Sequence, residues 1–398
     1  MSRLSAPYRY GRVRPWRGRD GLPLRTARKT ARVLQQLAPK RLGAAAVGDS
    51  QLAMLTDRGA GRGAGLTIAC VNPLECADEI KRLFVAHERP EFPAYFDRVY
   101  PDAVAEGATS WVGRDEHGRV CAYVAQFPRL FLLGRRIVHG SLLANLMVAT
   151  AYRSFWPGLA LVRRVVKDLK QCSSVDFVYT DPNEPARAIL ERAGFRTVGP
   201  LRRLILPLTD RRRSVDLGIR LYHLIGRLRT RGTPLVLTEQ RASEKHVVLD
   251  QAPPQDSRSL LPLPGASLYR CRLAGYPSAS DCWYSFHAAG PPRVPVGQAL
   301  VRGPDERGRA VVSVLQCEPT TLLSSLLGAL AQRLRRAGVA RLEVWVMAGS
   351  HVACEARRAG FVPRQEQIPI VGRPFTALGT EALAAGSEWQ LLPVHLDR

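Results

Sequence analysis

The chain of 398 residues carries 58 Lys and Arg against 34 Asp and Glu, a formal net charge of +24. Hydrophobic residues make up 46% of it, enough to supply a core for each of two domains, whereas one domain of this length would be unusually large. Only six of the basic residues are Lys. A GC-rich coding sequence produces such an Arg excess, so we favour a compositional origin of the charge over an anionic partner.

Residues 1–42 form a strongly basic segment that holds twelve Lys and Arg against one acidic residue, Asp20. Gly and Pro are interspersed, so we expect residues 1–64 to be a disordered arm. Three accounts of the arm compete: a tether to RNA or an anionic membrane, a transit-like sequence, or residues added by a start codon assigned too far upstream. We favour the third account and expect nucleic acid as a partner only through this arm.

Eight cysteines are scattered without a CxxC pair and without His partners at the spacing of metal ligands. This pattern argues against a zinc site and a disulfide framework and favours reduced thiols. No run approaches the ~20 apolar residues that cross a bilayer, and no apolar stretch near the N-terminus resembles a signal peptide. We therefore expect no metal, no transmembrane segment and a cytoplasmic location. The cysteines are Cys70, Cys76, Cys121, Cys172, Cys271, Cys282, Cys317 and Cys354.

Residues 66–208 show a regular succession of apolar patterns. Short apolar or alternating runs predict strands, and apolar residues at every third or fourth position predict helices. The expected order is β-α-α-β-β-β-α-β-α-β. The elements are expected at 66–72 (strand), 73–90 and 91–104 (helices), 109–127 (two strands), 129–150 (apolar runs), 155–170 (helix), 174–180 (strand), 181–195 (helix) and 201–208 (strand).

Residues 146–195 and 312–361 can be laid side by side without a gap, at a constant offset of 166. Both run strand, helix, strand, helix and finish in RAGF, and their apolar positions stay in phase throughout. We therefore expect two copies of one fold. The expected division is a basic arm at 1–64, a first domain at 65–208, a linker with a helical pattern at 209–264 and a second domain at 265–398.

The stretch YRSFWPGLAL, residues 152–161, joins a strand to an amphipathic helix. A helix that begins there leaves its first backbone N–H groups unpaired and gathers partial positive charge. Gly158 lacks a Cβ, which lets phosphate oxygens approach the backbone, and Arg153 adds a positive charge. Pro157 suits a first helical turn because its missing N–H has no helical partner. The joint therefore predicts a site for a phosphate-bearing ligand.

The same stretch resembles the acyl-CoA pyrophosphate loop of the GCN5-related N-acetyltransferase superfamily, whose pattern is Arg or Gln, two residues, Gly, one residue, Gly or Ala. Arg153 takes the first position and Gly158 the last, whereas Trp156 stands where the first Gly is expected. NEPARAILERAGF resembles the later helix of that family, which begins near an Asn, here Asn183, and ends in Gly-Phe. The resemblance covers residues 66–208. It implies an α/β fold with two tandem domains of this family, each a mixed, largely antiparallel sheet flanked by helices.

By resemblance, the chain is an acyl-CoA-dependent N-acyltransferase, with acetyl-CoA or another acyl-CoA as substrate, an amine as acceptor and no metal. Main-chain amides near Val148–Thr150 are expected to polarise the thioester carbonyl. The residues implied to bind acyl-CoA are Val148, Thr150, Arg153, Trp156, Gly158, Leu159, Ala160 and Asn183.

The general base is expected to be a carboxylate, a histidine or a water relay with a pKa near neutrality. Many members of the family have a Tyr as general acid where this chain has Leu190, so no phenol protonates the leaving thiolate from that position. The candidates are Tyr179, Asp181 and His139 and, in the early helical region that lines the family's acceptor site, His87, Glu88 and Glu91.

The second copy keeps the apolar frame but lacks the polar residues of the loop, so we expect a degenerate domain without an acyl-CoA site. At the offset of 166, Arg153, Trp156, Gly158 and Asn183 are replaced by Pro319, Leu322, Ser324 and Gly349.

Several acceptors and one other class of function stay open. The segment SLYRCRLAGYP, residues 267–277, resembles a segment of envelope-associated tandem members, which favours a small molecule or an amino sugar of an envelope or polysaccharide pathway. The alternatives are a Fem-type transferase that takes an aminoacyl group from tRNA and a non-catalytic binding or scaffold protein. Transfer to oxygen in place of nitrogen is also open.

Overall fold

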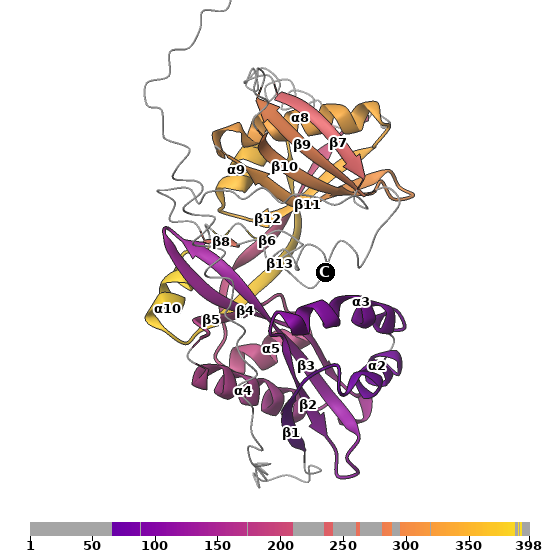
Figure 1. Ribbon diagram of the computed structural model, residues 1–398, viewed down its shortest axis with the longest axis vertical. Coiled ribbons are helices and arrows are strands. Elements are labelled where there is room, and N and C mark those ends of the chain that lie inside the picture. The colour runs from indigo at the N-terminus through magenta and orange to yellow at the C-terminus, as the bar shows by residue number, and fades with distance from the viewer. Residues whose placement is uncertain are drawn as a thin grey trace, which may run out of the picture. The chain divides into compact units, whose positions relative to one another are not determined.

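The computed structural model describes residues 66–87, 89–172, 174–209, 235–241, 260–262, 281–288, 295–318, 320–386, 389 and 391. The expected basic arm and the helical pattern of the expected linker lie outside the described residues. The described strands join into one 13-stranded sheet, which contains both repeats (Figure 1).

The first repeat has the element order that its apolar pattern predicts. A short 3₁₀ turn, Thr150–Tyr152, precedes α4. The elements are β1 (Thr67–Val71), α2 (Ala77–Val85), α3 (Phe92–Ala105), β2 (Thr109–Arg114), β3 (Val120–Leu133), β4 (Arg136–Val148), α4 (Phe155–Gln171), β5 (Phe177–Thr180), α5 (Glu184–Arg192) and β6 (Arg196–Pro207).

Helices cover both faces of the sheet of the first repeat, in which β1 to β4 are antiparallel and β5 runs parallel to β4 (Figure 1). On one face, α2 and α3 bring aromatic rings together: Phe84 stacks on Phe92 with centroids 3.6 Å apart, and Phe96 on Tyr100 at 4.1 Å. On the other face, the apolar residues of α4 recur at helical spacing and are buried with α5 against the sheet.

The second repeat follows the first at the offset seen in the sequence. Its last strand begins at Val362, 166 residues after β6 begins at Arg196. The elements are β9 (Cys282–Ala288), β10 (Pro295–Arg302), β11 (Arg309–Cys317), α8 (Leu323–Arg336), β12 (Arg341–Met347), α9 (His351–Arg358) and β13 (Val362–Pro374).

Three described elements fall where the sequence predicted no strand or helix. β7 (Leu235–Arg241) and β8 (Leu260–Pro262) lie within the expected linker; β7 pairs with β9, and β8 pairs with β3. A helix, α10 (Ala377–Ala384), follows β13. The expected linker therefore contributes two strands, β7 and β8, to the sheet.

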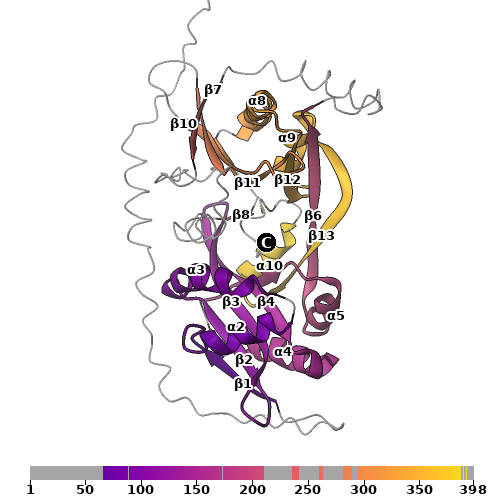
Figure 2. The ribbon, with the colours of Figure 1, turned by 90° about the vertical axis from the view of Figure 1, so that its right-hand side faces the viewer.

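The last strands of the two repeats change places. The sequence pattern made β6 the final strand of the first sheet, but β6 pairs with β12 of the second repeat, and β13 pairs with β5 of the first. β6 and β13 also pair with each other, antiparallel and side by side (Figure 2). The pairing thus crosses the expected boundary at 208, because each repeat completes its sheet with a strand of the other.

A charged cluster holds the exchanged strand β6 against its neighbours. Arg203 of β6 binds Glu343 of β12 through two hydrogen bonds, Nε to Oε2 at 2.9 Å and Nη2 to Oε1 at 2.7 Å. Glu343 is 1% exposed and Arg203 15%, and Arg203 also pairs with Glu366 of β13. Hydrogen bonding to Glu343 raises the pKa of Arg203 further above its ordinary value. The cluster fixes the register of β6 on both sides.

The C-terminal segment after β13 completes the core of the first repeat. Trp389 is fully buried and lies among Phe131, Phe177 and Tyr179, with centroids 5.5 to 6.1 Å away. Its indole N–H donates to the Ala382 carbonyl at 2.8 Å. Helix α10 packs against β4, β5 and β13.

The approach of α10 to β5 leaves no space for a side chain at Gly379, where a Cβ would stand 1.9 Å from the Asp176 carbonyl oxygen. The Asp176 carboxylate joins the same two parts of the chain. It accepts hydrogen bonds from the His139 main-chain N–H of β4, at 2.9 Å, and from the Thr376 hydroxyl before α10, at 2.7 Å. The segment that follows β13 and begins α10 is therefore built into the first repeat.

Glu343→Ala is expected to lower the free energy of unfolding by about 3 kcal/mol, because it leaves the mostly buried Arg203 guanidinium without its principal partner. Glu366→Ala is the matched control, since Glu366 is 59% exposed and binds the same arginine. That change should cost less than about 1 kcal/mol. Urea unfolding of both variants tests this, and equal losses would contradict the role given to Glu343.

Trp389→Ala is expected to destabilise the protein by about 3 to 5 kcal/mol, since it empties the centre of an aromatic cluster. Trp156→Ala, at a side chain that is 54% exposed, should change stability by no more than about 0.5 kcal/mol. Thermal unfolding and limited proteolysis of β4 and β5 provide the measurements. Unaltered protease resistance of these strands in Trp389→Ala would show that the C-terminal segment is dispensable for the first repeat.

Candidate functional site

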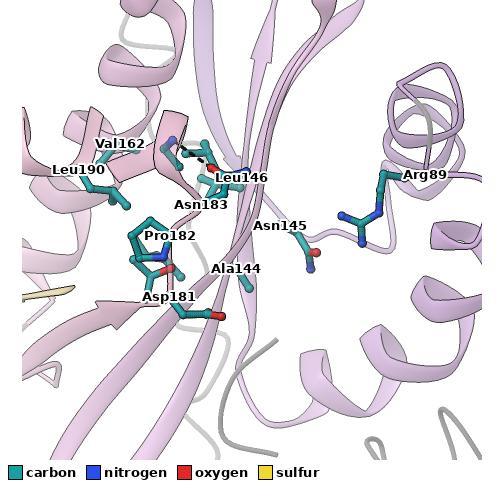
Figure 3. A pocket seen from close by; sticks show the side chains of 13 residues that line it. Arg89, Ala144, Asn145, Leu146, Val162, Asp181, Pro182, Asn183 and Leu190 are labelled. Atoms are coloured by element: carbon teal, nitrogen blue, oxygen red, sulfur yellow. Dashed lines mark hydrogen bonds between the residues drawn. The ribbon is translucent and has the colours of Figure 1, made fainter. Parts of the chain in front are cut away.

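The sheet of the first repeat opens between β4 and β5. The two strands pair from Gly140–Phe177 to Leu142–Tyr179 and no further, yet β4 continues for six residues, to Val148. Main-chain groups on that edge of β4 therefore face no strand, and a cavity of about 300 Å³ lies there (Figure 3). Its lining is Arg89, Val124, Leu143, Ala144, Asn145, Leu146, Val162, Thr180, Asp181, Pro182, Asn183, Ala186 and Leu190.

The cavity reaches both faces of the sheet. Leu143 and Val124 belong to the core beneath α4 and α5, whereas their neighbour Ala144 belongs to the core beneath α2 and α3. Figure 3 shows Asn183 and Leu190 on one side of β4 and Arg89 on the other. Two molecules that approach from opposite faces can therefore meet at the opening.

A β-bulge shapes the wall that β4 gives to the cavity. Ala144 pairs with Ala125 and Met147 with Tyr123, so β4 carries one residue more than β3 across this interval. Asn145 takes up the irregularity with φ of 58°, a conformation that Asn tolerates better than most residues. The bulge turns the main chain of β4 at the middle of the opening.

Hydrogen bonds beneath the bulge hold Asn145 in place. Its amide nitrogen donates to the Tyr100 hydroxyl of α3 at 3.1 Å, and Tyr100 accepts a second hydrogen bond from the Tyr123 hydroxyl at 2.9 Å. The Tyr123 hydroxyl also lies 2.9 Å from the hydroxyl of Ser110. All three hydroxyl-bearing residues are fully buried, so the chain of hydrogen bonds is shielded from water.

The start of α4 has main-chain donors that no helical acceptor satisfies. Ser154, the residue before the helix, is extended and makes no side-chain cap, so the amides of Phe155 and Trp156 lie open, and Pro157 has none. The Arg153 side chain folds back, and its Nε lies 3.3 Å from the Val148 carbonyl oxygen. Two amides and one guanidinium thus gather beside the end of β4.

Trp156 has the largest exposed fraction among the large hydrophobic side chains of the described residues, at 54%. The Arg163 guanidinium, about two helical turns further along α4, lies 5.9 Å from the centre of its ring. The indole therefore offers a flat apolar face next to positive charge at the start of α4.

Gly158 has a packing role that the sequence did not indicate. A Cβ at this position would stand 2.8 Å from Cδ1 of Ile189 and 3.8 Å from Val148. The missing side chain therefore admits Ile189 of α5, and the residue lies buried where α4 and α5 meet. The interpretation that Gly158 lets phosphate oxygens reach the backbone stays a prediction, and the packing of Ile189 is a second reason for a glycine at this position.

The turn before α4 is anchored to the β2–β3 hairpin. The Tyr152 hydroxyl donates to Asp115 at 2.8 Å, and the same carboxylate accepts hydrogen bonds from the main-chain N–H groups of His117 and Arg119 and from the Arg119 guanidinium. Burial alone would raise the pKa of Asp115, but these hydrogen bonds prevail and lower it to about 2. The carboxylate is therefore charged at every pH near neutrality and keeps the turn in place.

The loop between α2 and α3 closes over the end of β4 from the opposite side. His87 Nδ1 and Thr150 Oγ1 lie 2.9 Å apart and share a hydrogen bond. Arg89 Nε donates to Glu91 Oε1 at 2.5 Å, and this hydrogen bond lowers the pKa of Glu91. Glu91 is thus a weaker base than the sequence suggested, and Glu88 lies outside the described residues.

Of the three central candidates for the base, the structure places one in the cavity. Asp181 follows β5 directly, and its carboxylate extends toward β4 (Figure 3). Tyr179 is fully buried in the aromatic cluster of Trp389 and does not line the cavity. His139 lies exposed on β4, six residues before the bulge, and does not line it either.

The remaining predicted residues divide between the site and the core. Asn183 lines the cavity and caps α5, where its Oδ1 accepts from the Ala186 N–H at 3.0 Å. Leu159 is buried in the core and Ala160 is half-buried. The amide between Val148 and Thr150, that of Ala149, already donates to the Cys121 carbonyl at 2.8 Å. One of the amides expected to polarise a carbonyl is thus already paired within the chain, and the role of the stretch Val148–Thr150 stays a prediction.

Sequence reasoning missed Asn145 and Arg89. An Asn inside the apolar run SLLANLMV was a signal for a bulge, because Asn is depleted in strands and tolerates positive φ. Arg89 gave no such signal, because the sequence does not distinguish a ligand-binding Arg in a charged loop from an ordinary surface Arg.

The second repeat shows a different joint. α8 begins after Leu322, which makes no side-chain cap, and its first residue, Leu323, is buried. Between the turn before α8 and the start of α9, the His351 ring lies 3.4 Å from the Thr320 carbonyl oxygen. Ser324 is half-buried, Gly349 is exposed, and Pro319 lies outside the described residues.

The described part of the chain contains neither a candidate metal site nor a candidate membrane span. No three His, Cys, Asp or Glu side chains within it come close enough to hold a metal ion. None of its helices is both long and apolar enough to span a membrane.

Neither the models of known protein families nor the curated proteins match the sequence. Solved structures do match. A conserved protein of unknown function from Enterococcus faecalis V583, described as a probable N-acyltransferase, is 11% identical, with a TM-score of 0.56 over 79% of this chain and 73% of that chain.

Two further structures resemble this chain to a similar degree. A GCN5-related N-acetyltransferase from Kribbella flavida is 14% identical, with a TM-score of 0.53 over 78% of this chain and 73% of its own. Another, from Anabaena variabilis, is 12% identical, with a TM-score of 0.53 over 78% and 74%. The opening between β4 and β5, the bulge and the matching structures lead to one conclusion: the chain has the fold of the GCN5-related N-acetyltransferases, twice in tandem.

Proposed function

We propose that the first repeat is an acyl-CoA-dependent N-acyltransferase. The observation that carries the proposal is the cavity at the opening between β4 and β5, because it reaches both faces of the sheet beside an uncapped helix start. A thioester arm can enter from the face of α4 and α5, and an amine from the face of α2 and α3. The structures that match in fold include acetyltransferases, which agrees with this assignment.

The residues present offer more contacts to the pantetheine arm of acyl-CoA than to its pyrophosphate. The unpaired edge of β4 beyond Leu142 offers N–H and C=O groups to the amides of a pantetheine arm. The Phe155 and Trp156 amides and Arg153 would hold the pyrophosphate, with one amide fewer than a loop without Pro157 provides. Trp156 would cover an adenine or ribose face. We expect the arm to contribute more affinity than the phosphates.

The chemistry assigned to this chain is positioning and proton removal. Bulge amides at Asn145 and Leu146 would hold the carbonyl oxygen, and the hydrogen bond from Asn145 to Tyr100 keeps them in place beforehand. Asp181 would accept the proton that the ammonium group of the acceptor loses. Leu190 gives the cavity an apolar wall there. The rate advantage would come mainly from orientation in the opening.

We further propose an acetyl group as the group transferred and a small amine, such as an amino sugar, as acceptor. A cavity of about 300 Å³ has to hold the reacting end of the thioester and the acceptor together, and a long acyl chain would fill it alone. The second repeat is proposed to lack an acyl-CoA site, because its helix α8 starts with a buried leucine.

Ala186→Trp is expected to weaken acetyl-CoA binding at least about 50-fold, because the indole would fill the cavity from α5. Ala188→Trp is the matched control: it lies two residues further along the same helix, is exposed and does not line the cavity. Isothermal titration of acetyl-CoA into the full-length chain gives both affinities, and circular dichroism checks the fold. Equal affinities for the two variants would place the ligand elsewhere, and no binding by the unaltered chain would favour a tRNA-dependent or scaffold function.

Asp181→Asn is expected to lower the rate of acetyl transfer at least about 100-fold without a change in acetyl-CoA affinity, since the amide keeps the shape of the carboxylate but accepts no proton. Thiol release from acetyl-CoA in the presence of an amine panel gives the rate, and titration gives the affinity. His139→Gln and Tyr179→Phe serve as comparisons and should retain transfer, because neither side chain lines the cavity. Full activity of Asp181→Asn would exclude it as the base.

A further inference from the structure

We propose that the acceptor is an amine that also carries a carboxylate or a phosphate group, held by Arg89 while its amine lies near Asp181. The inference rests on the proposed function and deepens it, because it names the class of acceptor. It follows from the position of one arginine that no sequence motif explains.

Arg89 is held in a geometry that presents its terminal nitrogens. It lies in the short loop between α2 and α3, where its main-chain N–H donates to the Phe84 carbonyl at 3.1 Å. Its Nε is occupied by Glu91 at 2.5 Å. Nη1 and Nη2 have no partner among the residues that the structure describes. Figure 3 shows the guanidinium directed at Asn145 across the cavity.

The charges of the cavity lie at two separate places. Arg89 and Asp181 are its charged lining residues among those described, and they come from different elements, the α2–α3 loop and the end of β5. An acceptor with an ammonium group near Asp181 therefore has a guanidinium in front of its other end. Two parallel N–H groups on one carbon suit the two oxygens of a carboxylate or phosphate, and such bonds are about twice as strong as neutral ones.

Arg89 lies on the acceptor side of β4, and the groups suited to the phosphates of acyl-CoA lie elsewhere. The open amides belong to Phe155 and Trp156, at the start of α4, and Arg153 contacts the end of β4 there. Helices α2 and α3, which flank the loop of Arg89, pack in the aromatic core of the opposite face. The Glu91 carboxylate beside Arg89 also keeps the net charge at the loop low, so we expect Arg89 to act by direct hydrogen bonds and not by a diffuse positive field.

The test compares pairs of amines that differ only in the anionic group, in the full-length chain. The probes are L-amino acids against their amides, for a carboxylate, and glucosamine 6-phosphate against glucosamine, for a phosphate. Thiol release from acetyl-CoA gives kcat/KM for each amine, and titration gives the affinity for acetyl-CoA. The variants are Arg89→Gln and, as matched control, Arg82→Gln, at an exposed arginine in the last turn of α2 that does not line the cavity.

We expect the anionic member of one pair to be favoured about tenfold or more in kcat/KM by the unaltered chain and by Arg82→Gln. Arg89→Gln should lose this preference through a rise in KM, while its affinity for acetyl-CoA stays within about twofold. The pair that shows the preference tells carboxylate from phosphate.

Three results would overturn the inference and leave the proposed function standing. In the first, acetyl-CoA binds but the anionic amines are not favoured over their neutral partners. In the second, Arg89→Gln keeps the preference. In the third, Arg89→Gln weakens acetyl-CoA binding tenfold, which makes Arg89 a contact of the phosphates of CoA. Failure of the unaltered chain to bind acetyl-CoA is distinct, because it removes the proposed function and the inference together.

Discussion

The exchange of β6 and β13 is the constraint on which the rest of the structure depends. β5 is only four residues long and receives β13 on the side away from β4, so one wall of the candidate site is supported by the last strand of the chain. The hydrogen bonds between Arg203 and Glu343 hold β6 against β12 of the second repeat. A buried ion pair of this kind contributes less to stability than to the choice of a single register, because a shifted register would leave each charge buried alone.

The opening between β4 and β5 is the feature of the fold on which the candidate site is built. Parallel strands that diverge leave backbone groups without partners, which is costly unless a ligand or water satisfies them. The bulge at Asn145, held by the hydrogen-bonded chain of Tyr100, Tyr123 and Ser110, supports one edge, and the aromatic cluster around Trp389 packs against β5 at the other. Both edges of the opening are thus held by buried side chains, whereas the cavity between the edges is filled by neither.

The sequence allowed the element order of the first repeat and the offset of 166 to be predicted, because apolar periodicity is set locally by burial. It could not reveal the exchange, since apolar periodicity predicts that β6 and β13 are strands but does not name the strand with which each one pairs. It could not show that Ile189 packs against Gly158, because a missing Cβ has the same sequence signature whether a phosphate or a side chain approaches it. Asp181 was among the predicted bases, and its place in the cavity is visible only once β5 ends beside β4.

Because synthesis runs from the N-terminus, β5 is made long before its partner strand β13. During synthesis, β5 leaves the ribosome about 190 residues before the strand that covers it, since Tyr179 pairs with Gly372. Until then the nascent first repeat has an unprotected edge, which invites pairing with other chains. Contacts this distant in sequence also slow folding, because a long loop has to close before they form. A stop codon anywhere before β13 therefore removes more than the second repeat: it leaves the sheet of the first repeat without the strand that covers β5.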